Sequence, residues 1–221
     1  ATPDNGRVAL VEGYTVGDTV LWLWDERAGG LRRLYGTPLD EREPGEPMPL
    51  TSFGAAEFTR SGRGLLTITG LFADTYGLGY IALDDPGTVA RVEVRGTVHE
   101  GAGEMELVRH QRDDRYAVQY NIDGVSWLYE AHFDEDRLEM QLDVVVCGQP
   151  PLDGGMMDSF YYDAAADRYV LAHSSATSPT QIYTVTGPER EVVRRQTNER
   201  VLGLPESHLS PGEDASFVSH D

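Results

Sequence analysis

An internal repeat constrains the fold of this 221-residue chain more than any other feature of its sequence. Four segments begin with a small or acidic turn, continue with Arg and then enter an apolar run. They are NGRVALVE from Asn5, SGRGLLTI from Ser61, DDRYAVQY from Asp113 and ADRYVLAH from Ala166. Their arginines, Arg7, Arg63, Arg115 and Arg168, are 56, 52 and 53 residues apart. A nearly constant period indicates that one structural unit is built four times.

Each unit continues with the same order of short segments. Second segments, each followed by turn formers, are TVLWLWD from Thr19, LGYIALD from Leu78, SWLYEAHFD from Ser126 and TQIYTVTG from Thr180. More polar segments follow as GLRRLY from Gly30, TVARVEVR from Thr88, RLEMQLDVVV from Arg137 and REVVRRQT from Arg190. Three units also have a segment before the Arg-marked one: GAAEFT from Gly54, GEMELVRH from Gly103 and MMDSFYY from Met156. The first unit begins without it.

The periodicity of these segments predicts strands. Apolar or alternating runs lie between Gly, Asp and Pro, and no window sustains a helical stripe over three turns. Four strands in a repeat of roughly 40 to 50 residues are the signature of a β-propeller blade, whereas a parallel β-helix needs far shorter periods. We therefore predict an all-β chain, a partial β-propeller of about four four-stranded antiparallel blades. Approximate blade ranges are 1–38, 48–98, 102–147 and 154–197.

The charge balance limits the partners of the chain. It has 37 acidic and 18 basic residues, all of the latter Arg, for a net charge of -19. Nucleic acids and anionic membranes require a basic surface, so neither is expected as a partner. No segment approaches the roughly 18 apolar residues of a membrane span, and no signal-like N-terminus is present, so we expect a cytoplasmic protein. Cys147 follows an apolar run and is expected at the end of a buried strand.

No motif in the sequence indicates a catalytic site. The nearest approach to a Gly-x-Ser-x-Gly nucleophile elbow, Gly124 to Leu128 around Ser126, lacks the last Gly and falls in a predicted hairpin. His132, His173 and Asp158 are the residue types of a catalytic triad, but nothing in the sequence fixes their mutual geometry. We interpret them as polar residues on blade surfaces. No catalytic or cofactor-binding residue is predicted.

Metal and ligand motifs are equally weak. Asp134-Glu135-Asp136 lacks the Gly and closing Glu of a calcium loop and is predicted to be a solvated hairpin turn. The six histidines have no zinc-ligand spacing, so no metal site is predicted. Trp22, Trp24 and Trp127 are expected to pack between blades. The acidic, Pro-rich tract from Leu39 is expected to be a loop.

Two regions resemble a known family. The turn TPDNG from Thr2, followed by VALVE and LWLWDERAGGLRRL, resembles the blade motif of the prolyl oligopeptidase family of serine peptidases, particularly its acylaminoacyl-peptidase-like branch. The tract YVLAHSSATSPTQIYTV from Tyr169 is similar to the last blade of such peptidases. Residues 198–221, which end in Phe217-Val218-Ser219-His220-Asp221, resemble the connector into their α/β-hydrolase domain.

The resemblance implies a non-catalytic propeller segment that limits the access of peptide substrates to a hydrolase domain absent from this chain. The parent protein would be a serine peptidase, with the catalytic groups in that other domain. A free-standing propeller that binds a peptide or protein is the alternative. A five-bladed glycosidase is a weaker third reading, because no paired carboxylates are placed to flank a sugar bond. Because the first unit lacks its innermost strand, we also expect self-assembly into a homodimer or larger oligomer.

Overall fold

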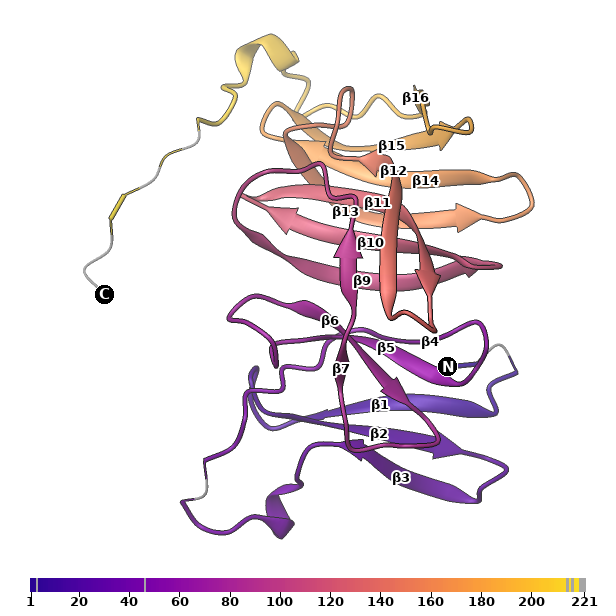
Figure 1. The fold of residues 1–221 in the computed structure, drawn as a ribbon. Helices are drawn as coiled ribbons and strands as arrows, with labels where there is room; N and C mark the ends of the chain where they lie inside the picture. The colour runs from indigo at the N-terminus through magenta and orange to yellow at the C-terminus, as the bar shows by residue number, and fades with distance from the viewer. Residues whose placement is uncertain (3, 46, 214, 216, 219–221) are drawn as a thin grey trace.

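The computed structural model describes residues 1–2, 4–45, 47–213, 215 and 217–218, and it is built almost entirely of β-strands. Four sheets of antiparallel hairpins follow one another along the chain and lie as a stack (Figure 1). Two 3-10 turns, Leu39–Glu41 and Glu206–His208, are the helices in this part of the chain. The predicted fold class, a partial β-propeller, is confirmed.

Each sheet forms one blade, and its strands follow the chain outward from the innermost position. The first blade contains β1 Arg7–Gly13, β2 Thr19–Asp25 and β3 Gly30–Tyr35. The second contains β4 Ala56–Phe58, β5 Gly64–Thr69, β6 Gly77–Ala82 and β7 Ala90–Arg91. The third contains β9 Gly103–Arg112, β10 Arg115–Ile122, β11 Val125–Asp134, β12 Glu139–Cys147 and the added β8 Glu93–Arg95. The fourth contains β13 Gly155–Asp163, β14 Arg168–Ser175, β15 Ser178–Thr186 and β16 Val192–Arg195.

Strand numbers differ from the four per blade that were predicted. The first blade has three strands, with none inside β1 among the described residues, as expected from the segment that its unit lacks, whereas the third blade has five. The segment from Thr88, expected to be one strand of the second blade, is divided: β7 pairs with β6, and β8 pairs in parallel with β12 of the third blade. Buried Val92 separates the two parts. Since the Glu93 amide donates to the Leu138 carbonyl at 2.9 Å, this segment joins two neighbouring blades at their outer edges.

The core is divided among the three interfaces between neighbouring blades. Interface one joins Leu21, Leu23 and Leu34 to Phe58, Leu65, Ile81 and Leu83. Interface two joins Leu66, Ile68 and Leu78 to Met105, Tyr116, Tyr129 and Ala131. Interface three joins Ala117, Leu128 and Val146 to Met157, Tyr169, Leu171 and Val185. Because a middle blade has a neighbour on each side, both of its faces are buried, which explains why all six residues of β5 are buried.

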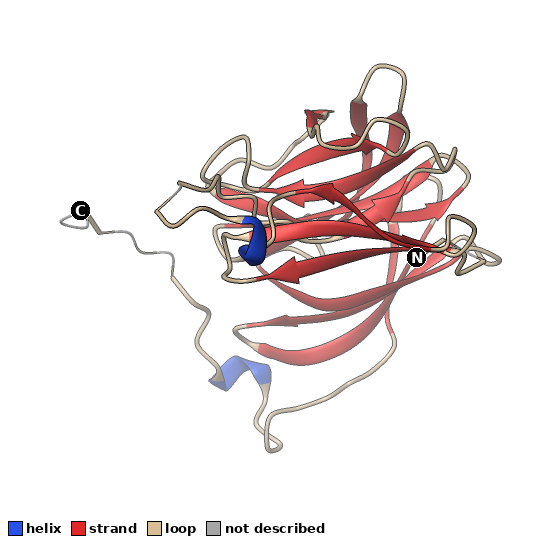
Figure 2. Ribbon diagram, turned by 90° about the horizontal axis from the view of Figure 1, so that it is seen from below, coloured by secondary structure: helices blue, strands red, loops and turns tan. Residues whose placement is uncertain are grey.

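The two ends of the stack differ from its middle. Trp127 packs against the cluster between the second and third blades, as predicted. Trp22 and Trp24 lie instead on the face of the first blade that is turned away from the second blade, where Trp24 is 37% exposed. Beyond β16 the chain leaves the sheets (Figure 2). Pro3 of the predicted first turn and Ser219 to Asp221 of the predicted connector lie outside the described residues.

Candidate functional site

In the first three repeats, the Arg that marks the repeat connects its blade to the next one. Arg7 of the first blade donates to the Gly62 carbonyl of the second at 3.0 Å. Arg63 of the second blade donates to Asp136 of the third at 2.9 Å, and Arg115 of the third donates to Asp167 of the fourth at 3.1 Å. The repeated motif therefore positions blades relative to one another.

Glu135 is a second inter-blade contact, and sequence reasoning missed it. Its carboxylate accepts hydrogen bonds from the hydroxyls of Thr59 and Tyr80, both at 2.9 Å, and from Ser61 at 2.5 Å. Burial acts to raise the pKa of Glu135, but these hydrogen bonds outweigh it and lower the pKa. The prediction of a solvated turn at 134–136 describes Asp136, whose side chain is 84% exposed, but it is wrong for Glu135. The partners of Glu135 lie in another repeat, so no local signal could reveal them.

A buried ionic network joins the third and fourth blades. Arg190 donates to Glu130 at 2.7 Å and to Asp167 at 2.8 Å, and the Tyr169 hydroxyl donates to Glu130 at 3.0 Å. The Arg190 and Glu130 side chains are almost fully buried. Burial opposes ionisation of Asp167, yet the hydrogen bonds from Arg190 and Tyr162 lower its pKa to about 2. Because these charged groups bind one another, the network is suited to fixing two blades rather than to acid–base chemistry.

The candidate triad residues are only partly brought together. Ser126 is fully buried in β11, and its Oγ accepts a hydrogen bond from the Met157 amide at 3.0 Å. His173 lies opposite Met157 in β14, but within the described residues no hydrogen bond joins it to Ser126. Asp158 accepts a hydrogen bond from Thr180, and His132 pairs with Asp143 at the surface. This geometry exposes no serine beside a histidine base.

Cys147 ends β12 as the sequence predicted, and it is buried. Burial raises the pKa of its thiol to about 12, so the thiolate needed for nucleophilic chemistry is disfavoured. Among the described residues, no group of three His, Cys, Asp or Glu side chains is arranged to hold a metal ion. Nor is any helix within this part of the chain long and apolar enough to cross a membrane.

A hollow of about 800 Å³ lies between the first two blades, beside the innermost strands β4 and β9 and the outer turn after β2, and we call it the axial hollow. Lining residues come from the segment before β1 and the start of β1, from the end of β2 and the turn after it, from β4 and the turn after it, and from β9; they include Thr2, Asp4, Arg7, Asp25, Arg27, Glu57, Arg60, Gly62 and His110. Gly62 has a φ of +70°, and a Cβ there would lie 2.8 Å from the end of the flexible Arg7 side chain, so the backbone conformation of this turn favours glycine.

Glu57 lies in the axial hollow and its carboxyl is partly buried. Burial raises the pKa of its carboxyl, and nearby His110 and Arg109 only partly offset this effect. The hollow also contains the carboxylates of Asp4 and Asp25 and the guanidinium of Arg60. Charges of both signs suit the recognition of a peptide, which carries ammonium, carboxylate and amide groups.

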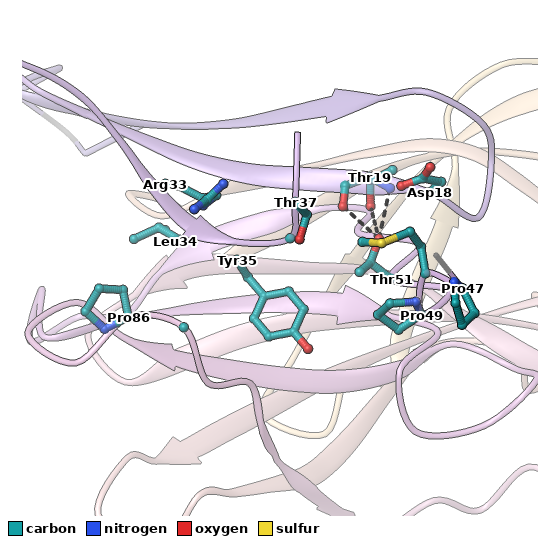
Figure 3. Close-up of a pocket in the computed structure, with 13 residues that line it drawn as sticks. Asp18, Thr19, Arg33, Leu34, Tyr35, Thr37, Pro47, Pro49, Thr51 and Pro86 are labelled. Atoms are coloured by element: carbon teal, nitrogen blue, oxygen red, sulfur yellow. Dashed lines mark hydrogen bonds between the residues drawn. The ribbon is translucent and has the colours of Figure 1, made fainter. Parts of the chain in front are cut away.

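A smaller pocket of about 420 Å³ lies at the outer edge of the first blade (Figure 3). Tyr35, Pro47, Pro49 and Pro86 give it an apolar side. At its polar end, Asp18 accepts two hydrogen bonds from Arg42, at 2.6 and 2.9 Å, which lower the pKa of that carboxyl. The negative charge of Asp18 is therefore already balanced by Arg42.

Hydrogen bonds hold the wall of the smaller pocket against β2. The Thr19 amide donates to Thr51 Oγ1 at 2.9 Å, and Thr51 Oγ1 donates to the Thr19 carbonyl at 2.8 Å. The pocket is thus a fixed surface slot without an available acid or base.

No protein-family model and no curated protein sequence matches the chain. Prolyl oligopeptidase B from Galerina marginata matches 92% of this chain with 26% of its own, at a TM-score of 0.62 and 14% identity. TolB from Acinetobacter baumannii matches 90% of this chain with 42% of its own, at a TM-score of 0.55 and 15% identity. A putative TolB from Agrobacterium tumefaciens matches 87% of this chain with 61% of its own, at a TM-score of 0.53 and 11% identity.

The chain is a β-propeller segment. It covers less than two thirds of each of these structures, and identities of 11% to 15% establish a shared fold alone. The axial hollow of the segment lies beside β4 and β9, the innermost strands of the second and third blades.

Proposed function

We propose that this propeller segment belongs to a serine peptidase of the prolyl oligopeptidase type and limits which peptides reach its α/β-hydrolase domain. The observation that carries the proposal is how the fourth blade holds residues 197–199. Gln181, fully buried in β15, accepts hydrogen bonds from Thr197 Oγ1 at 2.7 Å and from the Glu199 amide at 2.9 Å. Its Nε2 donates to the Glu199 carbonyl at 2.9 Å.

Gln181 lies within SPTQIY, the tract that resembles the last blade of these peptidases. The segment that it holds is the one that resembles their connector. A buried amide with three hydrogen bonds fixes where the chain leaves the sheets, as a link to a second domain requires. The match of 92% of this chain to prolyl oligopeptidase B also supports the proposal.

In this proposal the segment acts by exclusion and positioning. The axial hollow, at about 800 Å³, is within the size range of small-ligand sites, so it accommodates a short peptide but not a folded protein. Glu57 and Arg60 offer charges of opposite sign to the termini of such a peptide. Nucleophile, base and oxyanion donors would belong to the hydrolase domain.

A free-standing binding propeller is the second candidate. The specific observation in its favour is the likeness to two TolB structures, one of which is matched over 61% of its length. In that case the axial hollow would bind a segment of a partner protein, with no reaction.

The complete coding region tests the proposal. We expect an open reading frame that continues past Asp221 for roughly 250 residues, a typical domain size, and encodes Gly-x-Ser-x-Gly followed by Asp and His. A stop codon directly after Asp221 would contradict the peptidase reading and favour the binding module. The 221-residue chain alone is expected to hydrolyse no aminoacyl or peptidyl ester above a buffer control.

Variants of the full gene product test the gating role. Arg60→Glu, at the axial hollow, should raise KM for peptides with an acidic terminus and leave kcat for a small aminoacyl ester unchanged. Arg137→Glu is the matched control, because its side chain is 77% exposed in an outer turn. Equal effects of both variants on every substrate would exclude a gate at the axial hollow.

A further inference from the structure

The outer face of the first blade is apolar and uncovered. Val8 and Leu10 of β1 lie opposite Trp24 and Trp22 of β2, and Trp24 lies opposite Leu31 of β3. Because cross-strand pairs share one face of a sheet, these five side chains form a continuous surface, the first-blade face. Leu10 is 45% exposed and Leu31 is 53% exposed. Figure 1 shows this sheet at one end of the stack.

In the other blades, the side chains at the position of Trp24 lie in the interface with the preceding blade. Trp24 immediately precedes the Asp that begins the outer hairpin turn, and the corresponding residues of later blades are Leu83, Phe133 and Val185. Each belongs to the cluster that its blade shares with the preceding blade. Leu83 is 8% exposed and Val185 is fully buried. The first-blade face therefore has the position and chemistry of a surface that receives another blade.

The opposite end of the stack supplies a matching surface. Tyr161 of β13 lies opposite Val170 of β14, while Ile182 and Val192 occupy the same side of β15 and β16. These residues form the fourth-blade face, on which Tyr161 is 68% exposed. It corresponds to the side by which each earlier blade packs on its successor.

Polar groups at the two ends are also complementary. Arg7, Arg63 and Arg115 each reach a turn of the following blade. Arg168, at the fourth position of the repeat, instead donates to Asp163 of its own blade. Its buried Nε has no hydrogen-bond partner among the described residues. The first blade offers exposed Glu26, which occupies the turn position that Glu135 has in the third blade.

We propose that two copies of this chain associate head to tail, with the first-blade face of each on the fourth-blade face of the other. Two such contacts close a ring of eight blades with twofold symmetry, and the apolar side chains of both faces become buried. In the ring, Arg168 of one copy would face the Glu26 turn of its partner. This inference goes beyond the proposed function, because the mass of the assembly does not depend on any hydrolytic activity.

Light scattering on a size-exclusion peak tests the assembly. At physiological salt the wild-type chain should have twice the 24.4 kDa mass of one copy. Trp24→Glu and Tyr161→Glu each place a charge in both contacts of the ring, so each variant alone should be monomeric. An equimolar mixture retains one intact contact, between the first-blade face of Tyr161→Glu and the fourth-blade face of Trp24→Glu. The mixture should therefore recover the dimer mass.

Val16→Glu is the matched control, because Val16 is 87% exposed in a turn away from both faces; it should remain dimeric. Circular dichroism identifies any variant that fails to fold, and Leu31→Gln and Val170→Gln then replace it. A wild-type mass of 24.4 kDa at every concentration would overturn the proposal. So would dimers of Tyr161→Glu alone, because they would show that two first-blade faces contact each other.

Discussion

Several charged residues in this protein link neighbouring blades. Glu130 is the clearest case, since it accepts hydrogen bonds from Arg190 and Tyr169 in a site closed to water. Removing one member of a buried ion pair leaves the other charge desolvated and unpaired, which costs more than the pair itself contributes.

Glu130→Ala should therefore lower the free energy of unfolding by about 3–5 kcal/mol. Urea denaturation followed by fluorescence measures this change. The control is Asp143→Ala, which removes the surface partner of His132 and should cost within about 1 kcal/mol. Similar losses for the two variants would show that the network is not closed to water.

A buried histidine should make the stability depend on pH. Burial lowers the pKa of His173 below its ordinary value of 6.5, although Asp158 and Asp153 act in the opposite direction. The unfolded chain then binds a proton that the folded chain does not. The contribution of neutral His173 to stability is fully present above pH 6.5, and it is lost as the pH falls through 6.5 toward the pKa of His173 in the folded chain. Burial of His99 lowers its pKa and acts in the same sense.

His173→Asn should reduce this acid sensitivity. The measurement is the urea midpoint of wild type and variant between about pH 7.5 and pH 5, across the ordinary pKa of histidine. His132→Asn, at an exposed position, serves as the control and should keep the wild-type slope. An unchanged slope in His173→Asn would assign the pH dependence to other groups.

At the scale of elements, the sequence predicted the order of strands but not their register. Arg7 lies opposite Asp25, at the end of β2, whereas Arg115 lies opposite His132, two residues before the end of β11. The aligned arginines therefore differ in strand register, although Arg7 and Arg115 both contact a turn of the following blade. Irregular pairing shifts register by single residues, which a periodic pattern does not encode.

The candidate site was less predictable than the fold. The axial hollow combines Glu57 and His110, which belong to different repeats, so only the packing of blades brings them together. Likewise, β8 was missed because the apolar alternation of VARVEVR is continuous across the point where the strand changes blade. Local patterns identify strands, whereas partners more than fifty residues away depend on the assembled structure.

The crossing strand should matter through its main chain. Glu93→Pro removes the amide that donates to the Leu138 carbonyl, whereas Glu93→Ala removes only a surface side chain. The proline variant should be less stable than the alanine variant by about 1 kcal/mol or more. Hydrogen exchange should show faster exchange along β12 in the proline variant alone. Equal stability and exchange in both would mean that β8 does not fasten the two blades.

The whole molecule has a large excess of negative charge to accommodate. At a net charge of -19, compact folding brings like charges together, and this self-repulsion lowers stability. Some of the ion pairs that offset it, such as Arg190 with Glu130, are buried, and salt screens these pairs much less than it screens exposed carboxylates. Added salt should therefore weaken the repulsion more than the attraction.

We expect the Tm to rise steadily as NaCl increases from about 0.1 M to about 1 M, over which the screening length falls from roughly 10 Å to roughly 3 Å. Calorimetry at constant pH and protein concentration measures the change. Asp85→Asn combined with Asp74→Asn neutralises two exposed carboxylates and should raise the Tm at low salt while reducing its dependence on salt. A Tm that stays constant or falls with NaCl would mean that surface ion pairs such as Arg63 with Asp136 stabilise the fold more than the excess charge destabilises it.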